Sequence, residues 1–238
     1  MSIAANVAKV QEEIAEACHR CGRAEVDVAL MAVSKMHPAE AIAEVCGAGL
    51  RLFGENRVQE WQQKAPVVAQ LLGGSARIEM HLIGPLQSNK TARAAELFDA
   101  VDTVDSVRIA SRLNQTAMEL KRKLPVLIEV KLSLEETKHG IAPIDLPSLL
   151  DQFSSLEGLN PSGLMTVPPW SEEPESARPY FRELRRLRDT SLAQCPTLTQ
   201  LSMGMSNDFG VAIEEGSTCV RIGTAIFGKR QYPMKADV

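Results

Sequence analysis

Residues 197–228 read TLTQLSMGMSNDFGVAIEEGSTCVRIGTAIFG, and this stretch decides the fold. The apolar run 198–203 predicts a buried strand, and the glycine-containing turn 204–208 opens a predicted helix that ends at Gly216. A second strand, predicted at residues 218–222, runs into another glycine turn and a short final helix. Strand, glycine turn and helix in tandem are typical of the last two units of a parallel α/β fold.

The residues before this stretch repeat the same alternation. The run VALMAVS (28–34) is continuously apolar, as expected for a strand covered on both faces. Eight strand–helix units in 238 residues favour a closed (β/α)8 barrel of the TIM type over a doubly wound sheet, and no GxGxxG follows the first strand. The other strands are predicted at residues 50–53, 78–83, 100–104, 126–130 and 163–166.

The organisation of the chain is simple. Residues 2–21 precede the first strand and carry apolar side chains at helical spacing, which predicts an extra N-terminal helix on the outside of the barrel. A helix is also predicted at residues 107–123. No linker, repeat or low-complexity tract divides the sequence, so we expect residues 1–238 to form a single domain.

Composition argues against several classes of function. A formal net charge of −4 and only 4% aromatic residues speak against a nucleic-acid-binding protein. The sequence has no apolar run of membrane-spanning length and no signal-peptide pattern at its N-terminus. Five cysteines, an odd and sparse number, indicate reduced thiols and therefore a cytoplasmic protein. The four histidines show no spacing typical of a metal site.

Polar residues near the predicted strand ends indicate the chemistry, because such a barrel carries its active site at the carboxyl ends of its strands. Ser206 and Thr224 occupy similar places in the two glycine turns, which suggests that their hydroxyls and the nearby N–H groups bind a phosphate. The alternative is that the glycines only permit tight turns. Lys35 ends the first strand, which neighbours the last strand in a closed barrel. An amine beside a phosphate suggests an imine with a phosphorylated aldehyde, either pyridoxal 5′-phosphate (PLP) or a phospho-sugar.

Two further residues are polar within apolar strands. Arg221 lies inside the strand predicted at residues 218–222, where its permanent charge requires a partner. One interpretation is a structural ion pair with a carboxylate, and the other is donation to the ring nitrogen of a ligand. His81 is interpreted as a core histidine whose hydrogen bonds are satisfied.

Six segments carry a resemblance to a known family: AVSKMHP (32–38), FGENRVQE (53–60), HLIGPLQSNK (81–90), GLMTVP (163–168), LSMGMSNDF (201–209) and GSTCVRIGTAIFG (216–228). Through them the sequence resembles the pyridoxal phosphate homeostasis proteins, which are PLP-binding barrels similar to the N-terminal barrel of alanine racemase (PLP fold type III). The resemblance implies that Lys35 binds PLP as a Schiff base, that Arg221 faces the pyridine nitrogen and that Asn56 lies beside the cofactor. It further implies a phosphate site formed by Ser206, Gly223 and Thr224.

Three functions remain to be distinguished. The first is a carrier without catalytic residues, which stores PLP and delivers it to PLP-dependent apo-enzymes, and which we expect to be a monomer or a weak dimer. The second is an amino-acid racemase, which requires a closing domain and a tyrosine base, whereas Tyr180 lies in an arginine-rich helix and Tyr232 near the end of the chain. The third is a phospho-sugar aldolase. An arginine facing the ring nitrogen favours the carrier, because it makes PLP a weaker electron sink.

One lysine in the loop after the fifth predicted strand is a candidate for assisting PLP release. Lys138 should project onto the same face of the barrel as Lys35. The alternative is an ordinary exposed lysine that is paired with Glu135.

Overall fold

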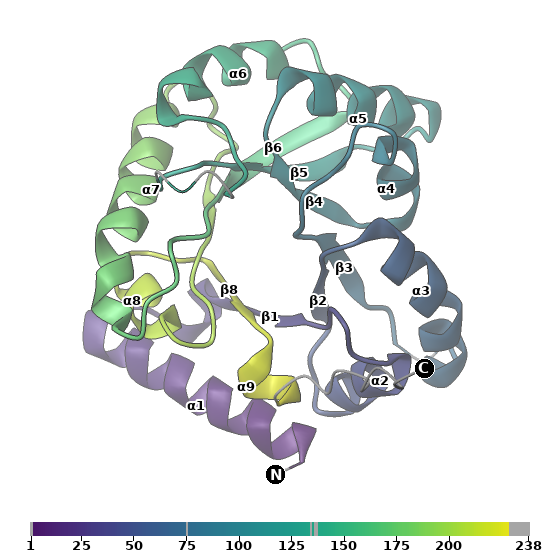
Figure 1. Cartoon of the computed structure of the whole chain (residues 1–238), viewed down its shortest axis with the longest axis vertical. Helices are drawn as coiled ribbons and strands as arrows, with labels where there is room; N and C mark the ends of the chain where they lie inside the picture. Colours follow the sequence, from purple (N-terminus) through teal and green to yellow (C-terminus); the bar gives the residue numbers. More distant parts are fainter. Residues whose placement is uncertain (1, 75, 134, 136–137, 229–238) are drawn as a thin grey trace, which may run out of the picture.

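The computed structural model describes residues 2–74, 76–133, 135 and 138–228. Eight parallel strands pair in chain order, and the last strand pairs with the first, so that the sheet closes into a barrel (Figure 1). The predicted (β/α)8 architecture is therefore confirmed. The strands are β1 (Ala29–Val33), β2 (Leu52–Glu55), β3 (Glu79–Leu82), β4 (Ala100–Val104), β5 (Leu124–Glu129), β6 (Leu159–Met165), β7 (Gln200–Ser202) and β8 (Cys219–Ile222).

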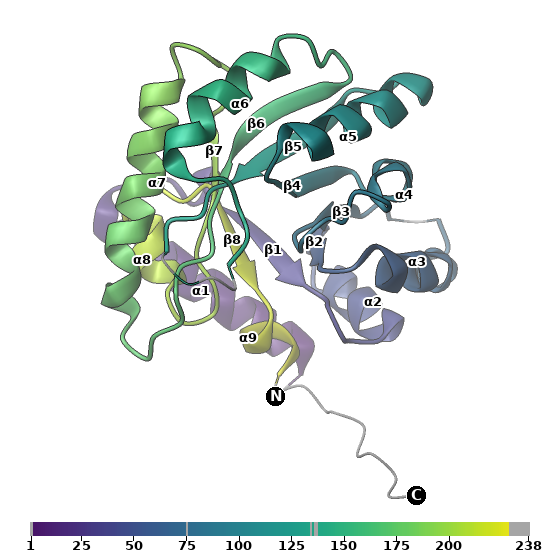
Figure 2. The same ribbon diagram turned by 45° about the horizontal axis from the view of Figure 1, so that its top comes forward.

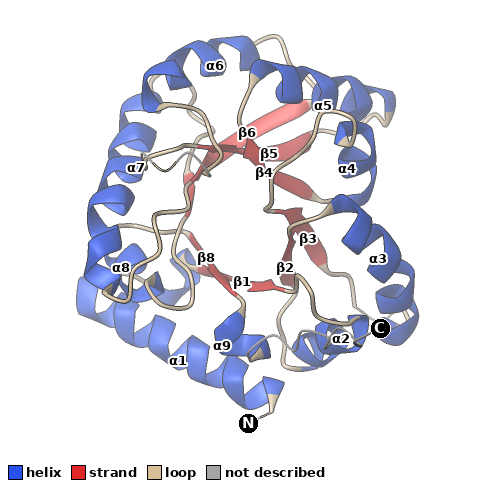
Figure 3. Cartoon of the chain, in the orientation of Figure 1, coloured by secondary structure: helices blue, strands red, loops and turns tan. Residues whose placement is uncertain are grey.

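The helices form a ring outside the strands, as Figure 3 shows. The main core lies between this ring and the barrel, where side chains such as Phe53, Val101 and Ile128 are fully buried. The α-helices are α1 (Ile3–Cys21), α2 (Ala39–Gly47), α3 (Val58–Leu72), α4 (Thr91–Leu97), α5 (Val107–Glu119), α6 (Leu146–Phe153), α7 (Arg178–Ser191), α8 (Phe209–Glu214) and α9 (Thr224–Phe227). Short 3-10 helices are η1 (Glu25–Asp27), η2 (Pro143–Asp145) and η3 (Pro174–Ala177).

The predicted N-terminal helix is present as α1. Ser2 caps its first turn by accepting a hydrogen bond from the backbone N–H of Ala5, and Gly22 ends it with a φ of +68°. Its buried face, which includes Val10 and Ile14, packs against α2, α8 and α9. Figure 2 shows α1 running behind α9, so the first helix supports the last one.

Pairing of β1 with β8 closes the barrel and determines where the site forms. Met31 lies opposite Arg221, and Ala32 lies opposite Ile222. The residues that follow these two strands therefore emerge side by side, which brings Lys35 close to Gly223 in space although they lie at opposite ends of the chain.

Several predicted boundaries differ from the structure, and two of them were wrong by four residues. Strand β6 begins at Leu159. The prediction placed its start at residue 163, because the segment 160–162 (NPS) resembles a turn. Pro161 is tolerated there because the β5–β6 register shifts beside it, between Val126 and Leu127. The helix predicted to reach residue 123 ends at Glu119, and Lys121 takes a φ of +52°. Among the described residues, none of the helices has both the length and the hydropathy needed to cross a membrane.

Candidate functional site

A cavity of about 530 Å³ opens at the carboxyl ends of the strands. This volume lies within the range of small-molecule and cofactor sites. All six residues that the sequence analysis assigned to a ligand line this one cavity: Lys35, Asn56, Ser206, Arg221, Gly223 and Thr224. The structure therefore brings together residues from β1, β2, β7 and β8 or the loops that follow them.

Lys35 lies in a tight turn directly after β1. The backbone N–H of His37 donates to the carbonyl of Ser34 at 3.1 Å, which closes a β-turn with Lys35 and Met36 at its centre. Val33, the last residue of β1, also lines the cavity. The turn therefore carries the Lys35 side chain from the strand end to the cavity wall.

Arg221 is held on the inner face of β8. Its side chain donates to Ser202 Oγ at 2.8 Å and to the carbonyl of Thr166 at 2.9 Å, and the residue is 4% exposed. Both acceptors are uncharged, so these hydrogen bonds do not correspond to the structural ion pair considered above. Burial lowers the pKa of Arg221, but an arginine remains charged in proteins. The cavity wall thus contains an oriented guanidinium.

The two glycine turns contact each other. The hydroxyl of Ser206 accepts a hydrogen bond from the N–H of Ala225, in the first turn of α9, at 3.4 Å. Ser206 does not cap α8, the helix of its own unit, because Asp208 is the residue that precedes α8. The Asp208 carboxylate accepts a hydrogen bond from the backbone N–H of Met205 at 2.6 Å. Gly204 has a φ of +97°, and a Cβ there would lie 2.6 Å from that of Ala212, so only glycine fits this turn.

Asn56 lies in the cavity wall with an unsatisfied polar atom. Its Oδ1 is buried and has no hydrogen-bond partner among the residues that the structure describes. The backbone here is tightly packed, since a Cβ on Gly84 would lie 2.3 Å from the Asn56 carbonyl oxygen. Buried polar atoms are normally hydrogen-bonded, so the orphaned oxygen indicates a place for a ligand donor.

Glu129 is a cavity residue that the sequence analysis missed. It is 7% exposed at the end of β5. Burial raises the pKa of the Glu129 carboxyl to about 7, although the charges of Arg221 and Lys138 oppose the shift. The available signal was an acidic residue within the apolar run VLIEV, which is the same signal that identified Arg221 within CVRI.

Lys138 and Trp170 also line the cavity. Lys138 Nζ donates to the carbonyl of Pro168 at 3.3 Å and lies 4.0 Å from a carboxylate oxygen of Glu135. The structure thus contains the pairing with Glu135 that the alternative expected, but Lys138 is only partly exposed and also lines the cavity. Trp170 was not predicted, and its side chain remains 74% exposed.

His81 lies inside the barrel and does not line the cavity. Its Nδ1 is 3.0 Å from Asp102 Oδ1, and its Nε2 is 2.9 Å from Glu79 Oε1. Burial lowers the pKa of His81, but the Asp102 and Glu79 carboxylates outweigh this effect and raise the pKa to about 10. The interpretation as a satisfied core histidine is confirmed.

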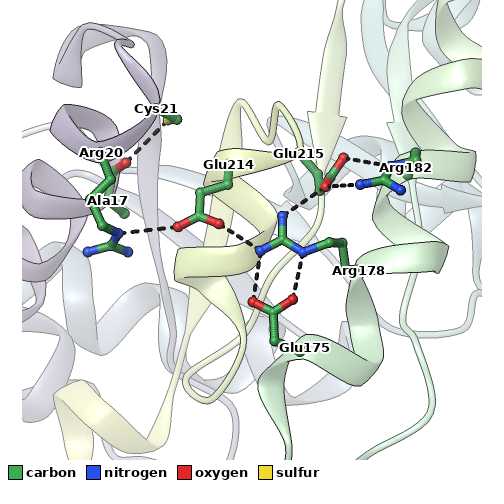
Figure 4. Close-up of polar contacts among 8 residues, drawn as sticks. All are labelled: Ala17, Arg20, Cys21, Glu175, Arg178, Arg182, Glu214 and Glu215. Atoms are coloured by element: carbon green, nitrogen blue, oxygen red, sulfur yellow. Dashed lines mark hydrogen bonds and ion pairs between the residues drawn. The ribbon is translucent and has the colours of Figure 1, made fainter.

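An ionic network supports the helix that follows the Ser206 turn. Arg178 of α7 contacts Glu214 of α8 at 2.7 Å and Glu215 at 2.8 Å, and it pairs with Glu175 at 2.6 Å. Glu214 also pairs with Arg20 of α1 at 3.2 Å (Figure 4). The network therefore ties α8 to both α1 and α7.

Comparison with known proteins identifies the family. Residues 3–231 match the family model described as alanine racemase, N-terminal domain. The chain is 42% identical over 233 residues to the pyridoxal phosphate homeostasis protein of Aquifex aeolicus, covering 98% of this chain and 100% of that protein. It is 44% identical over 239 residues to the protein of the same name from Escherichia coli K12, with 98% and 99% coverage. The structure of PipY from Synechococcus elongatus PCC7942 with PLP bound superposes with a TM-score of 0.83 at 38% identity, covering 95% of this chain and 100% of PipY. The chain therefore belongs to the pyridoxal phosphate homeostasis protein family, whose fold is that of the alanine racemase N-terminal domain.

Proposed function

We propose that this chain binds PLP in the cavity, stores it and delivers it to PLP-dependent apo-enzymes. The observation that carries the proposal is the convergence of Lys35, Arg221 and the Ser206 and Thr224 turns on one cavity. PipY, which is similar over its whole length, has been solved with PLP bound. We extend the proposal to a single PLP-binding domain over residues 1–238.

The residues of the cavity fit the groups of PLP. The orphaned Asn56 Oδ1 offers a hydrogen-bond acceptor for a ligand, and Arg221 contributes a buried donor. The hydroxyls of Ser206 and Thr224 lie in the same wall and suit a phosphate. Among the six residues assigned to the ligand, Lys35 is the one whose side chain is an amine that condenses with an aldehyde.

Each residue then has a separate task. The aldehyde of PLP supplies an electrophilic carbon to which an amine can bond. In our proposal the Lys35 amine would bond to this carbon, with the aldehyde oxygen leaving as water, and Ser206, Gly223 and Thr224 would hold the phosphate. Arg221 is fixed by Ser202 and Thr166 so that its remaining donors orient the ring nitrogen, and Asn56 lies beside the ring.

Storage without robust catalysis follows from Arg221. A guanidinium has donors but no acceptor, so it cannot hold a proton on the ring nitrogen, and it gives little support to carbanion chemistry. Racemisation also requires a second base. Tyr180 lies on α7 and does not line the cavity, and Tyr232 lies outside the described residues. We therefore favour the carrier over the racemase, and the racemase over the aldolase.

Borohydride reduction tests the central claim. The purified protein should be yellow, and reduction should fix one PLP on the peptide that contains Lys35, as read by mass spectrometry. A Lys35→Ala variant serves as the control for labelling of other lysines. An adduct on another lysine in the parent protein, or no adduct at all, would rule out the proposed site.

Delivery requires that the chain release PLP, and Lys138 is our candidate for assisting this step. It lines the cavity, and its weak contact with Glu135 leaves its amine within reach of a ligand. Lys138→Ala should slow the transfer of PLP to an apo-enzyme, measured as recovery of that enzyme's activity. An unchanged transfer rate would assign Lys138 a surface role only. We propose a cytoplasmic location and a monomer or weak dimer for this carrier.

A further inference from the structure

A buried polar cluster lies on the outer side of β1 and β2, directly behind the Lys35 turn. Glu55, at the end of β2, is completely buried, and its Oε1 accepts from Ser34 Oγ at 2.9 Å and from Lys64 Nζ at 2.8 Å. Lys64 belongs to α3 and its side chain is 13% exposed. None of these three residues lines the cavity, so the cluster is separate from the ligand-binding wall.

Lys64 connects this cluster to both neighbours of Lys35. Besides Glu55, its Nζ donates to the backbone carbonyl of Ser34 at 3.0 Å and to Glu60 Oε1 at 2.6 Å. Three acceptors match the three hydrogens of the ammonium group. The same Glu60 oxygen also accepts from the backbone N–H of Met36. One ammonium group therefore fixes the residue before Lys35 directly and the residue after it through Glu60.

The turn needs such an external support. Met36 has a φ of +62°, a left-handed conformation that is unfavourable for a residue with a side chain and that usually carries glycine at this position of a β-turn. The Met36 side chain is 56% exposed, so its own packing does not impose the conformation. Strained backbone of this kind persists only where surrounding contacts determine it.

We propose that Lys64 is a positioning residue, which holds the Ser34–Met36 backbone so that the Lys35 amine is presented to the aldehyde of PLP. The inference rests on the proposed function of Lys35. It assigns α3, which contributes no cavity residue, a role in covalent capture, whereas the phosphate and ring contacts belong to other elements.

A pair of ligands separates positioning from folding. PLP and pyridoxine 5′-phosphate share the ring and the phosphate, but the second has an alcohol in place of the aldehyde and forms no bond with Lys35. In Lys64→Met we expect at least a tenfold loss of PLP affinity and a tenfold slower borohydride-trapped labelling of Lys35. Affinity for pyridoxine 5′-phosphate, measured by calorimetry, should change less than twofold.

Three further variants complete the comparison. Lys9→Met removes an exposed lysine that pairs with Glu13 at i, i+4, the spacing that Lys64 has with Glu60, and it should change neither ligand's affinity. Glu60→Ala removes the support of Met36 but leaves the buried Lys64–Glu55 pair intact, so it replaces Lys64→Met if that variant does not fold. Glu60→Gln keeps an acceptor for the Met36 N–H, so Lys35 should be labelled faster in this variant than in Glu60→Ala.

The outcomes are distinct. Equal loss of both ligands in a folded variant would show a merely structural role for Lys64 and overturn the inference. Unchanged PLP labelling of Lys35 in both Lys64→Met and Glu60→Ala would also overturn the inference, while leaving the proposed function intact. A parent protein that carries no PLP on Lys35 would overturn the proposed function and this inference with it.

Discussion

At the scale of single residues, the hydroxyls of Ser206 and Thr224 provide the most direct test of the phosphate site. Ser206→Ala and Thr224→Val should each weaken PLP binding by about 1.5–3 kcal/mol, roughly ten- to a hundredfold in Kd, because each removes a donor to a charged acceptor. The dissociation constant can be measured from the visible absorbance of the bound cofactor.

Pyridoxal without the phosphate is the matched ligand for this test. Its affinity should be lower in the parent protein and almost unaffected by the two substitutions. Ser206 also accepts from the N–H of Ala225, so its loss could loosen the turn itself. Equal weakening for pyridoxal and PLP would show that the hydroxyls act through the fold and not through the phosphate.

Glu129 predicts a pH dependence of stability in the protein without PLP. The pKa of Glu129 is about 7 in the folded chain, against an ordinary value of 4.5. At a pH between these two values, the folded protein keeps a proton on Glu129 that the unfolded chain has released. The contribution of Glu129 to the free energy of unfolding therefore falls as the pH rises from about 4.5 to about 7. The glutamine in Glu129→Gln cannot titrate. The free energy of unfolding of this variant, relative to that of the parent, should therefore rise across this window by up to about 3 kcal/mol.

Urea denaturation of both proteins at several pH values measures this difference. Subtracting the two curves removes the other titrating groups, of which Glu55 and Asp208 also have raised pKa values because of burial. A difference that does not depend on pH would mean that folding does not raise the pKa of Glu129.

The sequence predicted the site residues that stand out from their surroundings. Arg221 interrupts an apolar strand and Lys35 directly follows one, and side chains at such places can point only into the barrel or toward its outer helices. The role of Lys64 could not be predicted, because it depends on how α3 packs against the end of β2, and the sequence spacing of Glu55 and Lys64 does not determine that contact. Asn56 was assigned by resemblance alone.

At the scale of elements, α8 depends on contacts from outside its own unit. It spans only Phe209–Glu214, which is too short to be stable alone, and Glu214 and the capping residue Glu215 lie in the Arg178 network. Arg178→Met should therefore lower the free energy of unfolding by about 2 kcal/mol. It should also increase amide hydrogen exchange in α8 and in the Ser206 turn that precedes it.

Arg186 offers a matched control on the same helix. Arg186 pairs with Glu183 at 2.6 Å, but this pair lies within α7 and is exposed on both sides. Arg186→Met should leave exchange in α8 unchanged. Similar exchange in α8 for both variants would mean that packing alone, and not the ionic network, holds α8 in place.

Order and type of the elements were predictable, but some boundaries were not. Apolar runs identified every strand, because strands covered on both faces have few polar residues. The start of β6 was missed because Asn160 and Pro161 resemble a turn, and only the neighbouring strand shows that a register shift accommodates the proline.

At the scale of the whole molecule, the proposed carrier should show no racemase turnover. A missing general base lowers a rate by about 10²–10⁴, and Arg221 further weakens stabilisation of a carbanion. L- or D-alanine incubated with the protein in deuterated water should exchange its α-hydrogen no faster than with an equal amount of PLP alone, as followed by NMR. Saturable and stereospecific exchange that disappears in Lys35→Ala would favour the racemase instead.

The pairing of β1 with β8 has a consequence for the synthesis of the protein. Lys35 is made early, whereas Ser206 and Thr224 are among the last residues of the barrel to leave the ribosome. Closure between such distant segments is slow and cannot precede completion of β8. A nascent or truncated chain would thus possess the amine but no phosphate site. We therefore expect PLP to be loaded only after translation, so that interrupted chains do not withdraw the vitamin from the cell.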